Sequence, residues 1–119
     1  MELYRPMNAK EYHELEARRF RGFPPRKEEQ PLFTVLLSEE DAFQIAKHMR
    51  ISKDLDNKVY VVGFLVEDAY IRQFPVHRGR PALWIPADEM NILNEHLIGD
   101  IRVLASYEID HANSEVFFA

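Results

Sequence analysis

Two arginines in this 119-residue sequence lie beside residues that would hold a guanidinium group in place. Arg5 stands between Tyr4 and Pro6 at the end of an expected first strand, and Arg26 follows the stiff segment Phe23-Pro24-Pro25. A guanidinium presents a planar fork of donors that matches the oxygens of a phosphate or a carboxylate. The pair therefore predicts a site for an anionic group, and the competing interpretation leaves both arginines as solvated surface charges.

Trp84 is the only tryptophan, and it lies in the apolar run Leu83-Trp84-Ile85-Pro86. A tryptophan in such a run either belongs to the core or forms the wall of a ligand pocket, because most of its large ring is apolar. Both interpretations remain open from the sequence.

Side chains that commonly ligate metals or act as nucleophiles show no matching pattern. The chain has no cysteine, and no metal-binding spacing joins its five histidines, His13, His48, His77, His96 and His111. Asp88 and Glu89 fall in the first turn of an expected helix, where the helix dipole favours carboxylates. We therefore expect no metal site and assign no catalytic residue.

The composition indicates one globular domain over residues 1–119, since 46% of the residues are hydrophobic and 29% are charged. The net charge of −5 argues against nucleic-acid binding, which needs a basic face. No apolar run approaches the roughly 18 residues of a membrane span, and residues 1–6 lack the apolar stretch of a secretory signal. These features predict a cytoplasmic protein without a membrane partner.

Hydrophobic periodicity divides the chain into short strands that alternate with helices. Strands are expected at 2–5, 32–37, 58–66, 83–85 and 101–109, helices at 9–19, 39–49 and 86–97, and a helical turn within 67–74. Pro6 is expected to end the first strand and Gly99 to follow the last helix. The segment 58–66 is apolar on both faces, which predicts a central, covered strand, whereas 101–109 alternates and predicts a half-buried one.

Two helix starts carry capping residues, because Asn8 precedes Glu11 by three positions and Ser38 precedes Asp41 in the same way.

No glycine-rich dinucleotide-binding turn follows the first strand, so we expect a compact α+β domain with a bent mixed sheet and about three helices. Residues 110–119 form either an added edge strand or a mobile tail.

Several short segments stand in a characteristic order: Leu3-Tyr4-Arg5-Pro6, Phe23-Pro24-Pro25-Arg26, Gln30-Pro31-Leu32-Phe33, Ser52-Lys53-Asp54, Phe74-Pro75-Val76 and Leu83-Trp84-Ile85-Pro86-Ala87. Together they make the chain, over about residues 3 to 107, resemble a family of small bacterial proteins labelled "ADP-ribosylation/crystallin". The layout also resembles a minimal ADP-ribosyltransferase core, which implies an α+β fold with two apposed sheets and a cleft for NAD.

The resemblance implies that Arg5 contacts NAD and that Phe33 and Thr34 shape a nicotinamide pocket. With Arg26 and Trp84, these residues form the expected site for NAD or ADP-ribose. Members of the small family tend to carry glutamate directly before the Leu-Trp pair, but this sequence has Ala82. An alanine cannot stabilise the cationic charge that develops when nicotinamide leaves, and loss of one such group commonly costs 10²–10³ in rate.

Two functions are therefore expected as alternatives. The first is an ADP-ribosyltransferase-like domain that binds NAD, ADP-ribose or a related nucleotide phosphate without efficient catalysis. The second is a protein-interaction or regulatory module without small-molecule chemistry, which forms a homo-oligomer or binds a protein partner through the apolar tail residues Val116-Phe117-Phe118.

Overall fold

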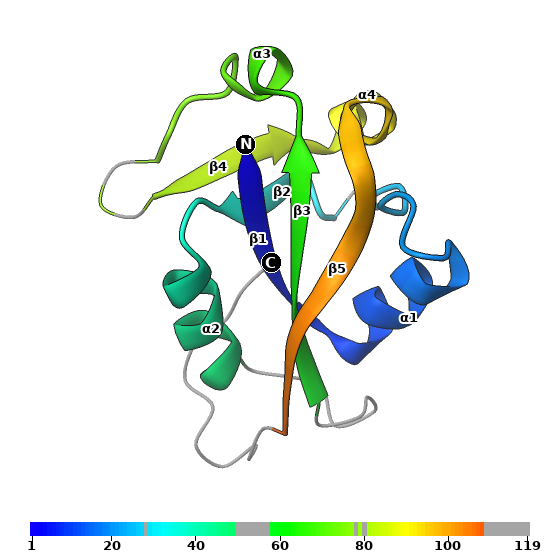
Figure 1. The fold of residues 1–119 in the computed structure, drawn as a ribbon, viewed down its shortest axis with the longest axis vertical. Coiled ribbons are helices and arrows are strands. Elements are labelled where there is room, and N and C mark those ends of the chain that lie inside the picture. The colour runs from blue at the N-terminus through cyan, green and yellow to red at the C-terminus, as the bar shows by residue number, and fades with distance from the viewer. Residues whose placement is uncertain (28, 50–57, 78, 80, 109–119) are drawn as a thin grey trace.

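An antiparallel sheet of five strands, in the order β4-β2-β1-β3-β5, organises the residues that the computed structural model describes, which are 1–27, 29–49, 58–77, 79 and 81–108 (Figure 1). The strands are β1 (Glu2–Asn8), β2 (Leu32–Leu36), β3 (Lys58–Val66), β4 (Ala82–Pro86) and β5 (Leu97–Glu108). The helices are α1 (Ala9–Ala17), α2 (Glu39–Lys47), α3 (Asp68–Ile71) and α4 (Met90–Glu95), and the 3₁₀ turn η1 (Ala87–Glu89) leads into α4.

The α+β class and the order of the elements are confirmed, but the sheet is not mixed. The neighbouring strands β4–β2, β2–β1, β1–β3 and β3–β5 all pair antiparallel. The described residues form one sheet rather than the two apposed sheets that the resemblance implies. The connections explain this arrangement. After α1 the chain returns as β2, antiparallel beside β1, and after α2 it continues as β3 on the other side of β1. The expected tail at 110–119 lies outside the described residues.

Both faces of the sheet are covered, as the two-faced apolar pattern of 58–66 predicts. On one face Val62, Phe64 and Val66 of β3 pack with α1, α3, α4 and the segment around Phe23. On the other face Val59 and other residues of β3 pack against the apolar side of α2. The strand is paired on both edges as well, with β1 and with β5, so the prediction of a central, covered strand is confirmed.

β1 continues through Pro6, so the expectation that this proline ends the strand is wrong. Pro6 stands opposite Val61 of β3, while β1 pairs with β2 at Tyr4 and Leu36. A proline is tolerated in a strand where the ladder does not need its missing N–H. The extension carries β1 directly into Asn8, the cap of α1.

The predicted helix caps are confirmed. The Asn8 side chain accepts a hydrogen bond from the Glu11 backbone N–H at 2.9 Å, and Ser38 accepts one from Asp41 at 3.3 Å. The first helix ends at Ala17, before the expected position, because the chain then turns through Arg19 and Phe20 with φ values of 57° and 59°.

Residues 97–108 form a long edge strand that replaces the end of the expected last helix. Gly99 does not cap that helix; it has a φ of 75° and lies in β5, between the residues paired with Leu65 and Gly63. A second irregularity leaves Leu104 without a partner residue, since its neighbours pair with adjacent residues of β3. This bulge breaks the expected alternation, and Val103 is 43% exposed. The Phe20 carbonyl accepts a hydrogen bond from Ile101 N–H at 2.8 Å.

Tyr70 on α3 contacts the residues at both ends of α4. Its hydroxyl donates to the carboxylate of Glu89, just before α4, at 2.8 Å, and its ring stacks on that of His96, just after α4, with centroids 4.4 Å apart. Burial, followed by the nearby Glu89 carboxylate, raises the pKa of Tyr70. Glu89 therefore has a structural contact at the start of α4.

Asn94 on α4 fixes the segment that carries Arg26. Its side-chain oxygen accepts from Phe23 N–H at 2.8 Å, and its amide donates to the Phe23 carbonyl at 2.9 Å. Because Phe23 is 1% exposed, both backbone groups depend on this one side chain for hydrogen bonds.

Replacing Asn94 with alanine should lower the free energy of unfolding by about 1–3 kcal/mol, since two backbone groups of a buried residue lose their partners. Urea denaturation followed by circular dichroism measures the change. Asn91→Ala on the exposed side of the same helix is the matched control and should have little effect. Equal losses in the two variants would show that the Asn94 contacts do not stabilise the segment.

Candidate functional site

Arg5 is a buried cation on the face of the sheet that α1 covers. Its residue exposure is 2%, and it points among the apolar neighbours of β1 rather than into solvent. Its Nε and Nη2 donate to the two carboxylate oxygens of Glu11 at 2.6 and 2.8 Å, and its Nη1 donates to the Thr34 carbonyl at 2.7 Å. The two-point contact with one carboxylate is the strongest geometry that an arginine can make.

Arg26 reaches the same carboxylate from the proline-rich segment. Its side chain is 5% exposed, and its Nη1 donates to Glu11 Oε1 at 3.3 Å while its Nη2 donates to the Leu32 carbonyl at 3.1 Å. Its Nε is buried and has no acceptor among the described residues. Burial, and then the positive charge of Arg5, lower the pKa of the Arg26 guanidinium.

Phe33 of β2 lies beneath both guanidinium groups. Its ring centroid is 4.3 Å from the guanidinium carbon of Arg5 and 5.4 Å from that of Arg26. The face of an aromatic ring attracts cations, and the attraction grows where water is excluded. Phe33 is itself fixed by Phe23, whose ring centroid is 5.0 Å away. A rigid aromatic floor therefore helps to hold two like charges close together.

Glu11 is the site residue that the sequence pattern did not identify. In a full capping box its carboxylate would bond back to the Asn8 N–H, but here it accepts from Arg5 and Arg26 instead. Burial alone would raise the pKa of Glu11, but the two guanidinium groups outweigh it, and the pKa lies below its ordinary value. The available signal was the need of a buried arginine for a carboxylate, which the nearby capping glutamate satisfies.

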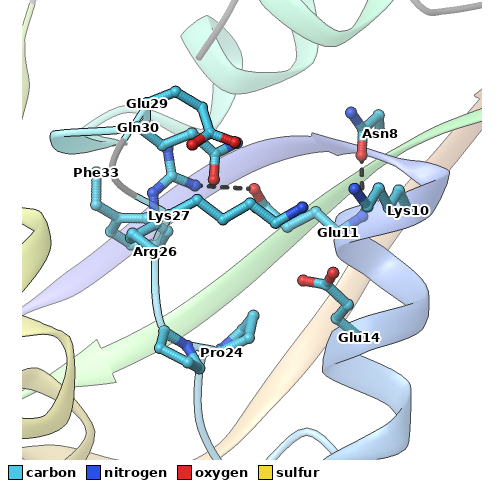
Figure 2. Close-up of a pocket in the computed structure, with 11 residues that line it drawn as sticks. Asn8, Lys10, Glu11, Glu14, Pro24, Arg26, Lys27, Glu29, Gln30 and Phe33 are labelled. Carbon is cyan, nitrogen blue, oxygen red and sulfur yellow. Dashed lines mark hydrogen bonds and ion pairs between the residues drawn. The ribbon is translucent and has the colours of Figure 1, made fainter.

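A pocket of about 180 Å³ opens beside this cluster, between residues 8–14 at the start of α1 and the facing segment of residues 24–27 and 29–30 (Figure 2). Phe33 contributes to its lining, and its charged residues are Lys10, Glu11, Glu14, Arg26, Lys27 and Glu29. Pockets that enclose drug-sized ligands have roughly 300–1,000 Å³. The pocket therefore has room for a group the size of a phosphate or carboxylate with a short substituent, and not for a whole dinucleotide.

The structure brings together three of the five predicted site residues, which are Arg5, Arg26 and Phe33. Thr34 contributes its backbone carbonyl, and Trp84 lies away from the pocket lining. Trp84 stands opposite Thr34 in the neighbouring strand, so the two side chains share the face opposite to Phe33. Trp84 is 45% exposed with the His77 ring 4.2 Å away, so it belongs neither to the core nor to the wall of this pocket.

Ala82, which occupies the position of the glutamate in the resembling family, lies on the far side of the sheet from the pocket. It is 4% exposed and packs with Leu36 and α2, whereas Phe33 belongs to the opposite cluster. A side chain at this position therefore faces the packed interior beneath α2, away from the arginines.

Among residues 1–27, 29–49, 58–77, 79 and 81–108, no three His, Cys, Asp or Glu side chains come together to hold a metal ion. No helix in that part of the chain has the length and apolar character needed to cross a membrane. Comparison of the chain with family models, with curated proteins and with solved structures finds no match.

Glu11→Ala should lower the free energy of unfolding by about 3–5 kcal/mol, because Arg5 would remain buried without its counter-charge. Chemical denaturation gives this value. Glu16→Ala, on the same helix, is the matched control, because Glu16 is 58% exposed and its loss should matter little. A small loss in Glu11→Ala would mean that Arg5 does not depend on this carboxylate.

Acidification should weaken the fold through Glu11. Its pKa is lowered in the folded state, so its contribution is complete above the unfolded value near 4.3 and is lost as the pH falls through the folded pKa. The unfolding free energy of the unmodified protein should therefore fall more steeply below about pH 4 than that of Glu11→Gln. Urea denaturation at a series of pH values compares the two slopes, and parallel curves would contradict the expectation.

Proposed function

We propose that the pocket between α1 and residues 24–27 and 29–30 binds an anionic group of a small molecule, with a phosphate of NAD, ADP-ribose or a related nucleotide as the ligand class. The observation that carries the proposal is the Arg26 side chain, which lines the pocket, is 95% buried and keeps one donor without an acceptor among the described residues. An unsatisfied buried donor costs about 1–3 kcal/mol, and a ligand oxygen would offset that cost.

The two arginines have different tasks in this proposal. The hydrogen bonds of Arg5 to Glu11 and to the Thr34 carbonyl, at 2.6 to 2.8 Å, make it the structural cation. Arg26 makes two longer contacts, at 3.1 and 3.3 Å, and it alone of the two lines the pocket. A ligand anion competes with Glu11 for Arg26 more readily than for Arg5, because hydrogen bonds to charged groups weaken as they lengthen.

The size and charge of the pocket determine which part of the ligand enters it. A phosphate with a short substituent fits a pocket of about 180 Å³, and the remainder of a nucleotide lies outside it. Lys10 and Lys27 line the pocket and are exposed, so their ammonium groups are available to further phosphate oxygens. The lysines attract the ligand as point charges, whereas the guanidinium orients one oxygen pair.

Binding without transfer of ADP-ribose is the activity that these residues support. The carboxylate nearest to the arginines, Glu11, is already neutralised by them. Ala82 supplies no carboxylate and lies beneath α2. Glu14 and Glu29 also line the pocket, but they are exposed, and a solvated carboxylate stabilises the developing oxocarbenium charge far less than a buried one.

Titration calorimetry with ADP-ribose tests the proposal. Arg26→Ala should weaken binding about 10- to 100-fold, the range expected for one charge-assisted contact of about 1.5–3 kcal/mol. Arg26→Lys should recover part of the loss, because it restores charge without the planar fork. Arg72→Ala is the control, since Arg72 is 73% exposed on α3 and pairs with Asp68.

Failure of the folded protein to bind millimolar ADP-ribose would overturn the proposal. Equal weakening by Arg26→Ala and Arg72→Ala would also overturn it, because the affinity would then reflect overall charge. Circular dichroism on each variant establishes that the fold is intact.

A further inference from the structure

Exposed side chains of both charge signs line the pocket. Lys10 and Glu14 come from α1, and Lys27 and Glu29 come from the facing segment. None of these four side chains makes a hydrogen bond or an ion pair with another described residue. Glu11, by contrast, is fully engaged by the two arginines. The pocket therefore holds exposed groups of both signs, and the charge of Glu14 also acts on the Arg26 guanidinium.

Each side of the pocket carries one positive and one negative exposed side chain. Figure 2 shows Glu14 projecting from α1 toward the facing segment, and Lys27 extending from that segment toward α1. Arg26 lines the pocket as well, and its buried Nε, on which the proposed function rests, has no acceptor among the described residues. A simple anion would satisfy Arg26 but would also approach the carboxylates of Glu14 and Glu29, which repel it.

We infer that the pocket takes a zwitterion: a small molecule with a phosphate or carboxylate for Arg26 and an ammonium group for Glu14 or Glu29. The inference rests on the proposed anion site and adds the second half of the ligand. A ligand of this class has both charges within a few bonds, which suits a pocket of about 180 Å³. It also gives the unpaired carboxylates a function that an anion alone does not.

Two probes that differ in one charge test the inference. O-phosphoethanolamine carries a phosphate and an ammonium group, and ethyl phosphate has the same phosphate with an uncharged tail. Titration calorimetry at low ionic strength should show about threefold to fivefold tighter binding of O-phosphoethanolamine, the ratio expected for one or two solvent-exposed ion pairs. Sedimentation of the protein with phosphatidylethanolamine vesicles is compared with its binding of free O-phosphoethanolamine. The comparison shows whether the ligand comes from a lipid surface or from solution.

The carboxylates are tested by the double variant Glu14→Gln with Glu29→Gln. It should lose the preference for O-phosphoethanolamine while its affinity for ethyl phosphate stays equal or rises, because repulsion of the anion is removed. Glu16→Gln, on the same helix but outside the pocket lining, should keep the preference. A merely structural role for the two carboxylates would instead weaken both probes together.

The outcomes separate this inference from the proposed function. Binding of ADP-ribose and ethyl phosphate with no preference for O-phosphoethanolamine would overturn the zwitterion inference and leave the anion site standing. An unchanged preference in the double variant would also overturn it. If ADP-ribose and both probes fail to bind the folded protein, the anion site and the zwitterion inference are both wrong.

Discussion

One carboxylate shared by two arginines sets the geometry of this part of the molecule. Glu11 joins the middle strand of the sheet, the first helix and the segment after the two prolines, because its partners Arg5 and Arg26 belong to two of these and Glu11 to the third. Paired charges withdrawn from water are stable only when each has its counter-charge and hydrogen bonds. The location of the pocket therefore depends on this contact, since Glu11 and Arg26 both line it.

Much of the scaffold follows from local rules in the sequence. The capping residues Asn8 and Ser38, together with the two-faced apolar run 58–66, are enough to predict the first two helix starts and a covered strand, because each signal acts within a few residues. The convergence of Arg5 and Arg26 near Phe33 is also anticipated. Glu11 escaped identification as a site residue because its capping position already gives it a complete local explanation.

Features that depend on pairing between distant strands were not predictable in this way. Pro6 stays in β1 because the strand ladder does not need its missing N–H at that position. Gly99 lies in β5 because Leu97 and Ile98 pair with the end of β3. The separation of Trp84 from the arginines follows from strand register, which places it on the opposite face from Phe33. A one-residue difference in register would have reversed that result, and nothing local to Trp84 specifies it.

The irregular backbone of β5 has a consequence for molecules that meet in concentrated solution. A long, regular outer strand offers a row of donors and acceptors on which a strand of another molecule can assemble. Here the bulge at Leu104 and the left-handed Gly99 interrupt that row, and the Phe20 carbonyl occupies the Ile101 donor. This protection against intermolecular sheet growth is built into the main chain, so it persists when salt or acid removes the repulsion between surface charges.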